Sequence, residues 1–259
     1  MEPGERETMP AGAAAAIVLV VMTVVLLLVL LVALGTPRQS EEGTMSDEQW
    51  RRDRERMVEL IARRGIDDER VLEALRRVPR HEFVPGPLRE RAYDDSPLPI
   101  GAGQTISQPY VVALMSAALE LEGGERVLEL GTGSGYQAAM LAELADSVFT
   151  IEYFPELADS ARATLERLGY AGVQVRAGDG WRGWPGKAPF DAALITFATP
   201  EIPPALLEQV RSGGPICAPL GPSGGTQELT VVRKRPDGRV ERSSMGAVRF
   251  VPVQGEGAR

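Results

Sequence analysis

Cysteine and histidine are almost absent from this sequence of 259 residues. Cys217 is its only cysteine and His81 its only histidine, which excludes a disulfide framework and a zinc cluster of cysteines and histidines. No metal site is therefore expected. We expect any chemistry to proceed without a histidine or a thiol. The formal net charge of -8 argues against a nucleic-acid partner, because such binding needs a basic face.

Charged residues are also missing from a long apolar segment near the N-terminus. Residues 11–34 contain no charged side chain, and a helix that spans a bilayer needs about 20 apolar residues. The apolar stretch of a signal peptide is shorter, about 7–15 residues. The sequence thus predicts a tail over residues 1–10, a transmembrane helix over 11–34 and a linker over 35–46.

Basic residues near the two ends of this segment predict its orientation. Arg6 precedes it, and the arginines that follow it are Arg38, Arg51, Arg52, Arg54 and Arg56. Under the positive-inside rule, the larger C-terminal part then lies in the cytoplasm and is anchored to the membrane by a single span. The alternative is a soluble cytoplasmic protein, if translation starts at Met45.

Residues 47–122 predict a helical extension that ends in a long loop and a further helix. Apolar residues recur at helical spacing from Trp50 onward, and again from residue 67 to residue 79. The mixed charges of this region are typical of solvated helix faces. We expect His81 to pack or to be solvated within the extension.

The loop itself covers residues 93–110 and is rich in glycine and proline. It predicts an ordered loop without regular secondary structure. Ser107 can cap the next helix, with Pro109 in the first turn of that helix.

Strands and helices alternate from residue 123 to the C-terminus. Strands are predicted at residues 126–130, 147–152, 173–177, 191–196 and 215–220, and helices at 136–144, 155–168 and 203–210. Such alternation is typical of a parallel sheet with helices on both faces. The turn residues 236–238 then join 228–235 to 240–253 and predict an antiparallel hairpin. The fold class is therefore α/β, a Rossmann-like doubly wound sheet, mostly parallel with an antiparallel C-terminal hairpin.

Three glycines follow the first of these strands directly. Gly131, Gly133 and Gly135 lie in VLELGTGSGYQ, between a predicted strand and a predicted helix. Glycine permits a tight turn there and lets a ligand lie against the main chain. The spacing is GxGxG, unlike the GxGxxG of dinucleotide sites, and no Walker lysine follows. The segment therefore predicts a ligand-binding loop, with a plain strand-to-helix turn as the alternative.

Carboxylates stand at positions near this loop that suit a nucleoside ligand. Glu152 ends the second strand, where a carboxylate can accept hydrogen bonds from ribose hydroxyls. Asp179 follows the third strand and could bind an adenine amino group, and Glu129 could help to hold an ammonium group. The alternatives are a surface carboxylate, a turn aspartate and a strand-end charge, respectively. Trp181 and Trp184 are expected in the core rather than beside adenine.

In their order, these segments resemble a class I S-adenosylmethionine methyltransferase. More narrowly, residues 45–254 resemble the protein-L-isoaspartate(D-aspartate) O-methyltransferase family. The most specific matches are LPIGAGQTISQPYVVALM at residues 98–115 and VLELGTGSGYQAA at 127–139. The others are RVPRHEFVP at 77–85, GDG at 178–180, PFDAALIT at 189–196 and VRFVPV at 248–253. The chain departs from the family at Ala102 and Phe197, which bears on substrate preference.

The resemblance implies a repair enzyme for damaged proteins and peptides. Its cofactor would be S-adenosyl-L-methionine, and it would methylate the carboxylate of L-isoaspartyl residues. This carboxylate is already ionised near pH 7, so no general base is needed. Residues 47–122 would then form the extension and substrate loop, and 123–259 the cofactor-binding core.

The resemblance also implies the roles of single residues. Ser107 is the active-site serine, whose hydroxyl donates to the substrate carboxylate. Thr105 and Gln108 are candidates for substrate contact, with hydrogen bonding inside the loop as the alternative for both. The cofactor-binding residues are Glu129, Gly131, Gly133, Gly135, Glu152 and Asp179.

Two other functions fit part of the sequence. One is a related carboxyl methyltransferase that acts on a dedicated peptide partner. The other is a membrane-tethered protein that holds the cofactor without turnover, against which the intact glycine loop and Ser107 argue. The loop spacing disfavours a nicotinamide dehydrogenase. The protein is expected to be monomeric and to bind no nucleic acid.

Overall fold

The computed structural model describes Met22 and residues 45–258. Apart from Met22, the predicted transmembrane helix at residues 11–34 lies outside the described residues, so it stays a prediction. Within the described part of the chain, no helix is both long enough and apolar enough to cross a bilayer. Residues 46–258 belong to one compact unit, and the boundary at residue 123 between the extension and the core stays a prediction.

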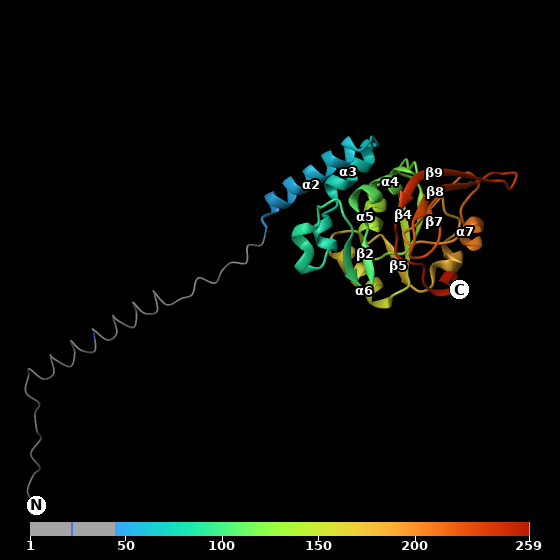
Figure 1. Cartoon of the computed structure of the whole chain (residues 1–259). Coiled ribbons are helices and arrows are strands. Elements are labelled where there is room, and N and C mark those ends of the chain that lie inside the picture. Colours follow the sequence, from blue (N-terminus) through green and yellow to red (C-terminus); the bar gives the residue numbers. More distant parts are fainter. Residues whose placement is uncertain (1–21, 23–44, 259) are drawn as a thin grey trace, which may run out of the picture. The chain divides into compact units, whose positions relative to one another are not determined.

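The main sheet has seven strands (Figure 1). In spatial order they are β5 (Gln174–Ala177), β4 (Ser147–Glu152), β3 (Arg126–Leu130), β6 (Ala192–Ile195), β7 (Pro215–Leu220), β8 (Gln227–Lys234) and β9 (Val240–Val248). The pairs from β5 to β7 are parallel, and β8 and β9 are added antiparallel. This confirms the predicted α/β class, with a mostly parallel sheet and an antiparallel C-terminal hairpin.

The chain reverses its direction of travel across this sheet between β3 and β6. From β3 it moves outward through β4 to β5, and it then returns to place β6 on the other side of β3. In sheets of this kind, ligands bind at the carboxyl ends of the strands where the order reverses. The topology therefore points to the ends of β3 and β6 as the place of a site.

Helices α5 (Tyr136–Ala142), α6 (Pro155–Arg167) and α7 (Pro204–Gln209) connect the parallel strands. Side chains of β3 alternate between the two faces of the sheet. On one face, Leu128 and Leu130 join Leu206 of α7 in a buried cluster. Burial of a side chain of this size stabilises the fold by about 1.5–3 kcal/mol.

Two helices form the extension before the sheet, as the apolar spacing predicts. Helix α2 (Asp47–Arg63) begins at a capping box, in which Ser46 and Gln49 bond reciprocally. Helix α3 (Glu69–Arg77) begins at Asp68, whose carboxylate accepts from two main-chain N–H groups. The buried side chains of α2 are Trp50, Met57, Val58 and Ile61.

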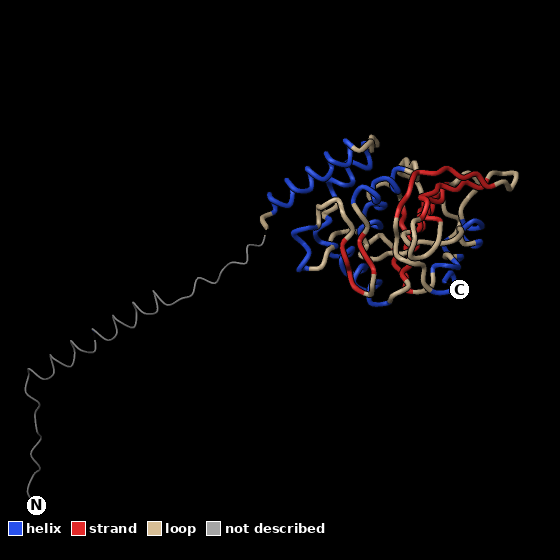
Figure 2. The backbone as a smooth tube through the Cα atoms, in the orientation of Figure 1, coloured by secondary structure: helices blue, strands red, loops and turns tan. Residues whose placement is uncertain are grey.

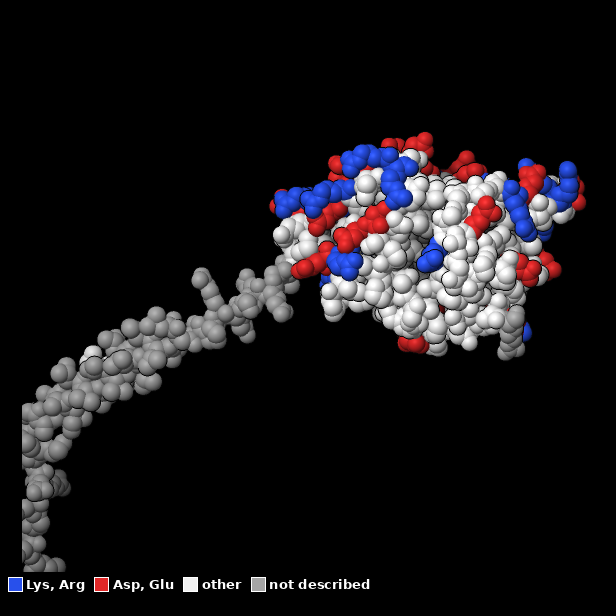
Figure 3. All heavy atoms as spheres, viewed as in Figure 1, with Lys and Arg blue, Asp and Glu red and all other residues white. Residues whose placement is uncertain are grey.

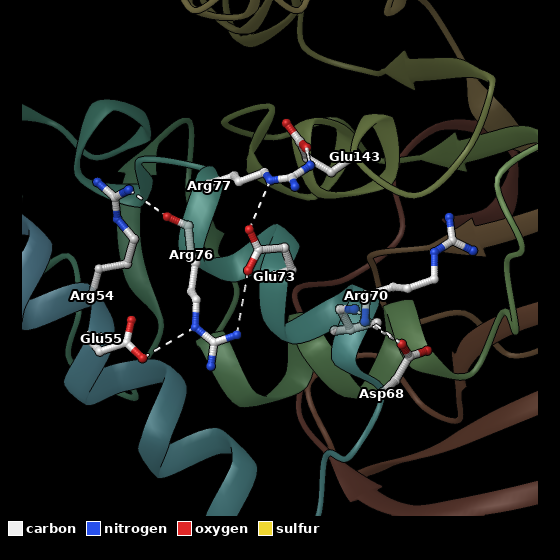
Figure 4. Close-up of polar contacts among 9 residues, drawn as sticks. Arg54, Glu55, Asp68, Arg70, Glu73, Arg76, Arg77 and Glu143 are labelled. Carbon is white, nitrogen blue, oxygen red and sulfur yellow. Dashed lines mark hydrogen bonds and ion pairs between the residues drawn. The ribbon is translucent and has the colours of Figure 1, made fainter.

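Arginine side chains connect these helices with each other and with α5 (Figure 4). Arg76 lies 3.3 Å from Glu55 of α2, and Arg77 lies 3.3 Å from Glu143 just beyond α5. Basic and acidic side chains are interleaved over this surface (Figure 3), as expected for solvated helix faces. Exposed ion pairs of this kind contribute only about 0–1 kcal/mol each.

His81 packs inside the extension, within η1 (Arg80–Phe83). Its ring stacks on Trp50 with the ring centroids 4.5 Å apart, and its Nδ1 lies 2.8 Å from the Tyr93 hydroxyl. Burial lowers the pKa of His81 to about 4, so the ring is neutral at pH 7 although Glu82 lies 3.4 Å from it. The predicted packing role is thus confirmed.

Residues 93–110 contain more regular structure than predicted. Strands β1 (Leu98–Gly101) and β2 (Gln104–Ile106) form a separate antiparallel pair where the sequence predicts only a loop. The strands are short and β1 includes Pro99, so they leave no alternating pattern to detect. Residues 101–103, at the turn between them, all have positive φ.

Strand β9 is shorter than predicted. It ends at Val248 instead of Val253, and the chain then returns beside Ala198, just beyond β6. There the Ala198 N–H donates to the Val251 carbonyl at 2.8 Å, and the Val253 N–H donates to the Ala198 carbonyl at 3.0 Å. Figure 2 shows the long β8–β9 hairpin and the loop that comes back from it. This return brings residues 251–254 to the carboxyl ends of the parallel strands.

Candidate active site

The loop between β3 and α5 meets the residues that follow β6. Gly131 has a φ of 97°, and a Cβ at this position would overlap the Thr196 hydroxyl. That hydroxyl donates to the Gly131 carbonyl at 2.5 Å, and the Thr196 N–H donates to the Leu130 carbonyl at 3.0 Å. Both the positive φ and the close approach therefore require glycine here.

The other two glycines of the loop serve different purposes. The Gly133 N–H donates to the Glu152 carboxylate at 2.8 Å, and Gly133 lines a cavity. Gly135 begins α5 with a φ of 88°, and a Cβ there would press on Ala161 and Leu165 of α6 at 3.3 Å. Gly135 is not part of the cavity lining. Its position lets α5 pack against α6, and its role in cofactor binding stays a prediction.

The first cavity opens at the carboxyl ends of β3, β4 and β6, where the topology predicts a site. Segments that are far apart in the sequence line it. They are mainly residues 104–107, 131–134, 151–154, 179–181, 196–197 and 251–254. The wall therefore combines the glycine loop with two carboxylates, Glu152 and Asp179.

The first of these carboxylates, Glu152, is held by the main chain around it. Its Oε2 accepts from the Gly133 N–H at 2.8 Å, and its Oε1 accepts from the Phe154 N–H at 3.0 Å. The residue is only 4% exposed, yet it forms part of the cavity wall. Each oxygen retains lone pairs for further donors. Glu152 therefore lies where a ribose-binding carboxylate is predicted.

The second carboxylate, Asp179, lines the same cavity and also organises a turn. Its Oδ1 accepts from the Trp181 N–H and its Oδ2 from the Glu256 N–H, both at 2.8 Å. Asp179 thus makes the contacts of a turn aspartate, and its contact with an adenine amino group stays a prediction. Trp181 lines the cavity as well, contrary to its expected core position. Trp184 does pack on the core, edge-on to Phe149.

Glu129 is completely buried in β3 and does not line the cavity. Its Oε2 accepts from the Thr150 hydroxyl at 2.6 Å, and burial raises its pKa to about 8. The Thr150 hydroxyl lies 2.6 Å from that of Thr132, which lines the cavity. The two threonine hydroxyls thus connect the Glu129 carboxyl group with the cavity wall, and its contact with an ammonium group stays a prediction.

Ser107 lies where this cavity adjoins a second one. Gln108, Thr226 and Arg249 are among the residues that line only the second cavity. The residues that line both are Thr105, Ser107, Thr196 and Val251. The shared wall is therefore rich in hydroxyl groups. Ser107 is half-buried in it.

The helix after Ser107 is capped by a different residue. Helix α4 (Pro109–Ala117) has Gln108 at its N-cap position, with no capping bond from that side chain. Asp95 instead accepts from the Tyr110 N–H at 3.0 Å, in the first turn of the helix. The prediction that Ser107 caps α4 is therefore wrong, because the preceding loop supplies the acceptor.

Three of the four remaining residues of interest, Thr105, Gln108 and Phe197, line a cavity. Thr105 is exposed on the wall that both cavities share. Gln108 lines the second cavity, but its amide donates to the carbonyl and the carboxylate of Asp95, each at 2.9 Å. Gln108 thus forms the hydrogen bonds inside the loop that were the alternative to substrate contact. Phe197 lines the first cavity, whereas Ala102 is outside the lining of either.

Sequence reasoning missed the residues that the C-terminal return contributes. Residues 251–254 line the first cavity, and Arg249 lines the second. The segment VRFVPV was expected as a strand, so no ligand contact was assigned to it. Its place in the resemblance to the family was the one signal available. Thr196 was missed for a similar reason, since it ends an apolar run that predicts a strand.

These features define the class of the protein. A glycine loop that lines a cavity, followed by a carboxylate at the end of the next strand, suits a nucleoside ligand. A second cavity that meets the first at hydroxyl groups suits transfer of a group to an acceptor. With this sheet order, the fold and the site are those of a class I S-adenosyl-L-methionine-dependent methyltransferase.

Comparison with known proteins identifies the family within this class. The family model named protein-L-isoaspartate(D-aspartate) O-methyltransferase matches residues 51–258. A protein-L-isoaspartate O-methyltransferase of Methanoculleus marisnigri is 55% identical over 207 residues, covering 80% of this chain and 93% of that protein. One from Syntrophobacter fumaroxidans is 55% identical over 204 residues, covering 78% and 94%. The chain belongs to the protein-L-isoaspartate(D-aspartate) O-methyltransferase family.

Solved structures agree with this assignment. A protein-L-isoaspartate O-methyltransferase superposes with a TM-score of 0.72 at 28% identity, covering 79% of this chain and 67% of that one. A Plasmodium falciparum structure, described as a protein of the same family with S-adenosyl-L-homocysteine, has a TM-score of 0.65 at 23% identity. It covers 77% of this chain and 97% of that one, and it supports the fold.

Proposed function

We propose that this protein is a repair enzyme, which transfers the methyl group of S-adenosyl-L-methionine to the carboxylate of L-isoaspartyl residues in damaged proteins and peptides. Family membership supports the activity. The single observation that supports it in the geometry is the wall shared by the two cavities. Thr105, Ser107, Thr196 and Val251 line both cavities, so a donor held in the first and an acceptor held in the second would meet at these residues.

The first cavity fits the cofactor. Gly131 and Gly133 line this cavity and would hold the ligand from one side, and Glu152 would accept from the ribose hydroxyls. Asp179 and the ring of Trp181 would border the adenine. When bound, the sulfonium supplies an activated methyl group. The Plasmodium falciparum structure was solved with S-adenosyl-L-homocysteine, the product of such a transfer.

The second cavity fits an acidic acceptor. Arg249 is an exposed cation in its lining, and none of the ion pairs formed within residues 45–258 involves it. An isoaspartyl carboxylate is ionised near pH 7, so the chain has to align it and exclude water rather than remove a proton. Alignment alone supplies as much as ~7–11 kcal/mol in the best intramolecular reactions.

Ser107 is the residue to which we assign the alignment. Its hydroxyl would donate a hydrogen bond to one oxygen of the acceptor carboxylate and leave the other oxygen for the methyl group. Ser107 does not serve as a nucleophile in this scheme, because His81, the only histidine, packs in the extension against Trp50. Thr105 lies on the same wall and would contribute a second hydroxyl.

The test uses the purified full-length protein, labelled S-adenosyl-L-methionine and matched peptides that contain isoaspartate or aspartate. We expect methyl transfer to the isoaspartyl peptide alone. Ser107→Ala should lower turnover by roughly tenfold or more, the scale of losing one aligned donor, with cofactor affinity nearly unchanged. Ser243→Ala, on the exposed strand β9, is the matched control.

Each other result has a definite meaning. Equal transfer to both peptides would reject isoaspartyl specificity. Cofactor binding in calorimetry without transfer to either peptide would favour the non-catalytic alternative. A parallel loss of turnover and cofactor affinity in Ser107→Ala would make Ser107 a structural residue.

We also propose that residues 11–34 anchor the enzyme to a membrane, with the catalytic part in the cytoplasm. The support is the uncharged segment and the arginines that follow it. Cells are fractionated and probed with an antibody against the C-terminal part. We expect full-length protein in the membrane fraction, released by detergent but not by salt. A shorter chain in the soluble fraction would instead support a start at Met45.

A further inference from the structure

Arg80 is a fully buried charged residue of the extension, with 0% of its surface exposed. Its contacts are two main-chain carbonyls and an aromatic ring, and no carboxylate in the described part of the chain pairs with it. A buried guanidinium without a carboxylate loses its hydration at a cost of several kcal/mol. An apolar side chain would occupy this position without that desolvation cost, so the contacts of Arg80 need an explanation.

The hydrogen bonds of Arg80 hold the loop that carries Ser107. Its Nη2 donates to the Ser107 carbonyl at 2.8 Å, and its Nε donates to the Ala92 carbonyl at 2.7 Å. Residues 92 and 107 are the two ends of the segment that contains the β1–β2 pair. One guanidinium therefore fixes both ends of the segment that borders the two cavities.

The same guanidinium also contacts the cofactor side of the site. Its Cζ lies 4.8 Å from the centre of the Tyr136 ring. Tyr136 is the first residue of α5, directly after the glycine loop, and it lines the first cavity. Arg80 Nη1 and the Tyr136 hydroxyl are both buried, with no hydrogen-bond partner among residues 45–258. Arg80 thus connects the loop of Ser107 with the start of α5.

We propose that Arg80 is a positioning residue for methyl transfer, which holds the Ser107 main chain in register with the glycine loop. This inference rests on the proposed role of Ser107. A guanidinium suits the task because its rigid planar group donates in two directions at once, whereas an ammonium reaches fewer fixed partners. Burial lowers the pKa of Arg80 to about 10, so the group stays charged at neutral pH and the two hydrogen bonds persist.

The experiment compares Arg80→Lys and Arg80→Met with wild type in the full-length protein. We measure kcat and KM for the isoaspartyl peptide, and the Kd of S-adenosyl-L-homocysteine by calorimetry, which also counts the folded molecules. We expect kcat per folded molecule to fall roughly 10- to 100-fold, the scale of a small misplacement. The Kd should change little, and Arg80→Lys should lose less than Arg80→Met.

Arg70 offers a control with similar contacts, although its side chain is exposed whereas Arg80 is buried (Figure 4). It also donates to two carbonyls of separate segments, those of Leu121 and Leu144, but it lines neither cavity. Arg70→Met should lower thermal stability and leave kcat per folded molecule unchanged. An equal loss of kcat in Arg70→Met and Arg80→Lys would overturn the inference, because it would make the effect one of general stability.

A double variant separates positioning from every other role. In the Ser107→Ala background, Arg80→Lys should lower kcat only slightly further, because the effect of Arg80 depends on the Ser107 hydroxyl. The same fold-loss in both backgrounds would overturn the inference.

If Arg80→Met fails to fold, the comparison with wild type uses Arg80→Lys alone. If wild type itself fails on the isoaspartyl peptide, the proposed function fails. If wild type is active and both Arg80 variants keep its kcat, only this inference fails.

Discussion

The Thr150 hydroxyl donates a hydrogen bond of 2.6 Å to the Glu129 carboxyl group inside the parallel sheet. The Thr132 hydroxyl lies 2.6 Å from that of Thr150, so three polar groups link β3, β4 and the glycine loop. The other oxygen, Oε1 of Glu129, is buried without a partner in the described part of the chain. Because burial disfavours the charged form, the pKa of Glu129 rises to about 8. The sheet therefore holds a neutral acid at pH 7.

Glu129→Gln is expected to raise the free energy of unfolding relative to wild type. This gain should grow as the pH rises above 5. A glutamate in the unfolded chain ionises near pKa 4.5, whereas folded Glu129 keeps its proton up to about pH 8. Between these values the folded state binds more protons, so the stability of wild type falls as the pH rises. Glutamine does not titrate. The gain of the variant should grow from pH 5 to 8 and then level off.

Thermal melts of wild type and Glu129→Gln across this pH range check the prediction. Glu90→Gln is the matched control, because Glu90 is exposed and its variant should show no such trend. A stability difference that is independent of pH would contradict the assignment of a protonated carboxyl group at position 129.

His81→Phe is expected to make the protein less sensitive to acid. Burial lowers the pKa of His81 from 6.5 to about 4. The stabilising contribution of the neutral ring is therefore complete above pH 6.5 and is lost as the pH falls toward 4. Phenylalanine keeps an aromatic ring against Trp50 but binds no proton. Denaturant unfolding at pH 7 and pH 5 should show a smaller loss for the variant, and an equal loss would count against this explanation.

Much of the fold could be predicted because burial leaves a repeat in the sequence. The apolar run of β3 and the helical spacing of α2 both reflect a buried face. The β1–β2 pair could not be found in this way. Its strands are three and four residues long and make their own small sheet, so no long pattern of burial marks them.

The site was less predictable, because its contacts join residues that are distant in the sequence. The GxGxG spacing marks the loop, but only the packing of α6 shows that Gly135 serves the α5–α6 contact. Ser107 is of a residue type, and at a position, that are typical of a helix cap. Asp95 instead accepts from the Tyr110 N–H of α4, although it lies 15 residues earlier in the chain. The buried guanidinium of Arg80 behind Ser107 likewise has no signal in local sequence.

Asp95→Ala is expected to destabilise the protein by about 0.5–2 kcal/mol, the usual range for loss of a helix cap. The variant loses the acceptor for the Tyr110 N–H, as well as the contacts with Arg64 and with the Gln108 amide. Denaturant unfolding measures the change. Asp94→Ala is the control, because Asp94 is exposed and its ion pair among the described residues is with the exposed Arg91. Equal effects of the two variants would show that Asp95 is no cap.

Glu152→Gln is expected to weaken cofactor binding, by roughly tenfold for the loss of a charge-assisted hydrogen bond. The two oxygens of Glu152 accept from the N–H groups of Gly133 and Phe154. An amide offers only one acceptor oxygen, and its NH₂ group would face a second donor. The variant therefore loses both a ribose acceptor and part of the support of the glycine loop.

Calorimetry with S-adenosyl-L-homocysteine measures this effect. Glu156→Gln is the matched control, since Glu156 is exposed in the first turn of α6 and lies outside the cavity lining. Because Ser107 borders the acceptor cavity as well, its alanine variant should keep the wild-type Kd while Glu152→Gln does not. An unchanged Kd in Glu152→Gln would show that Glu152 does not bind the ribose. The nucleoside would then have to bind elsewhere along the cavity.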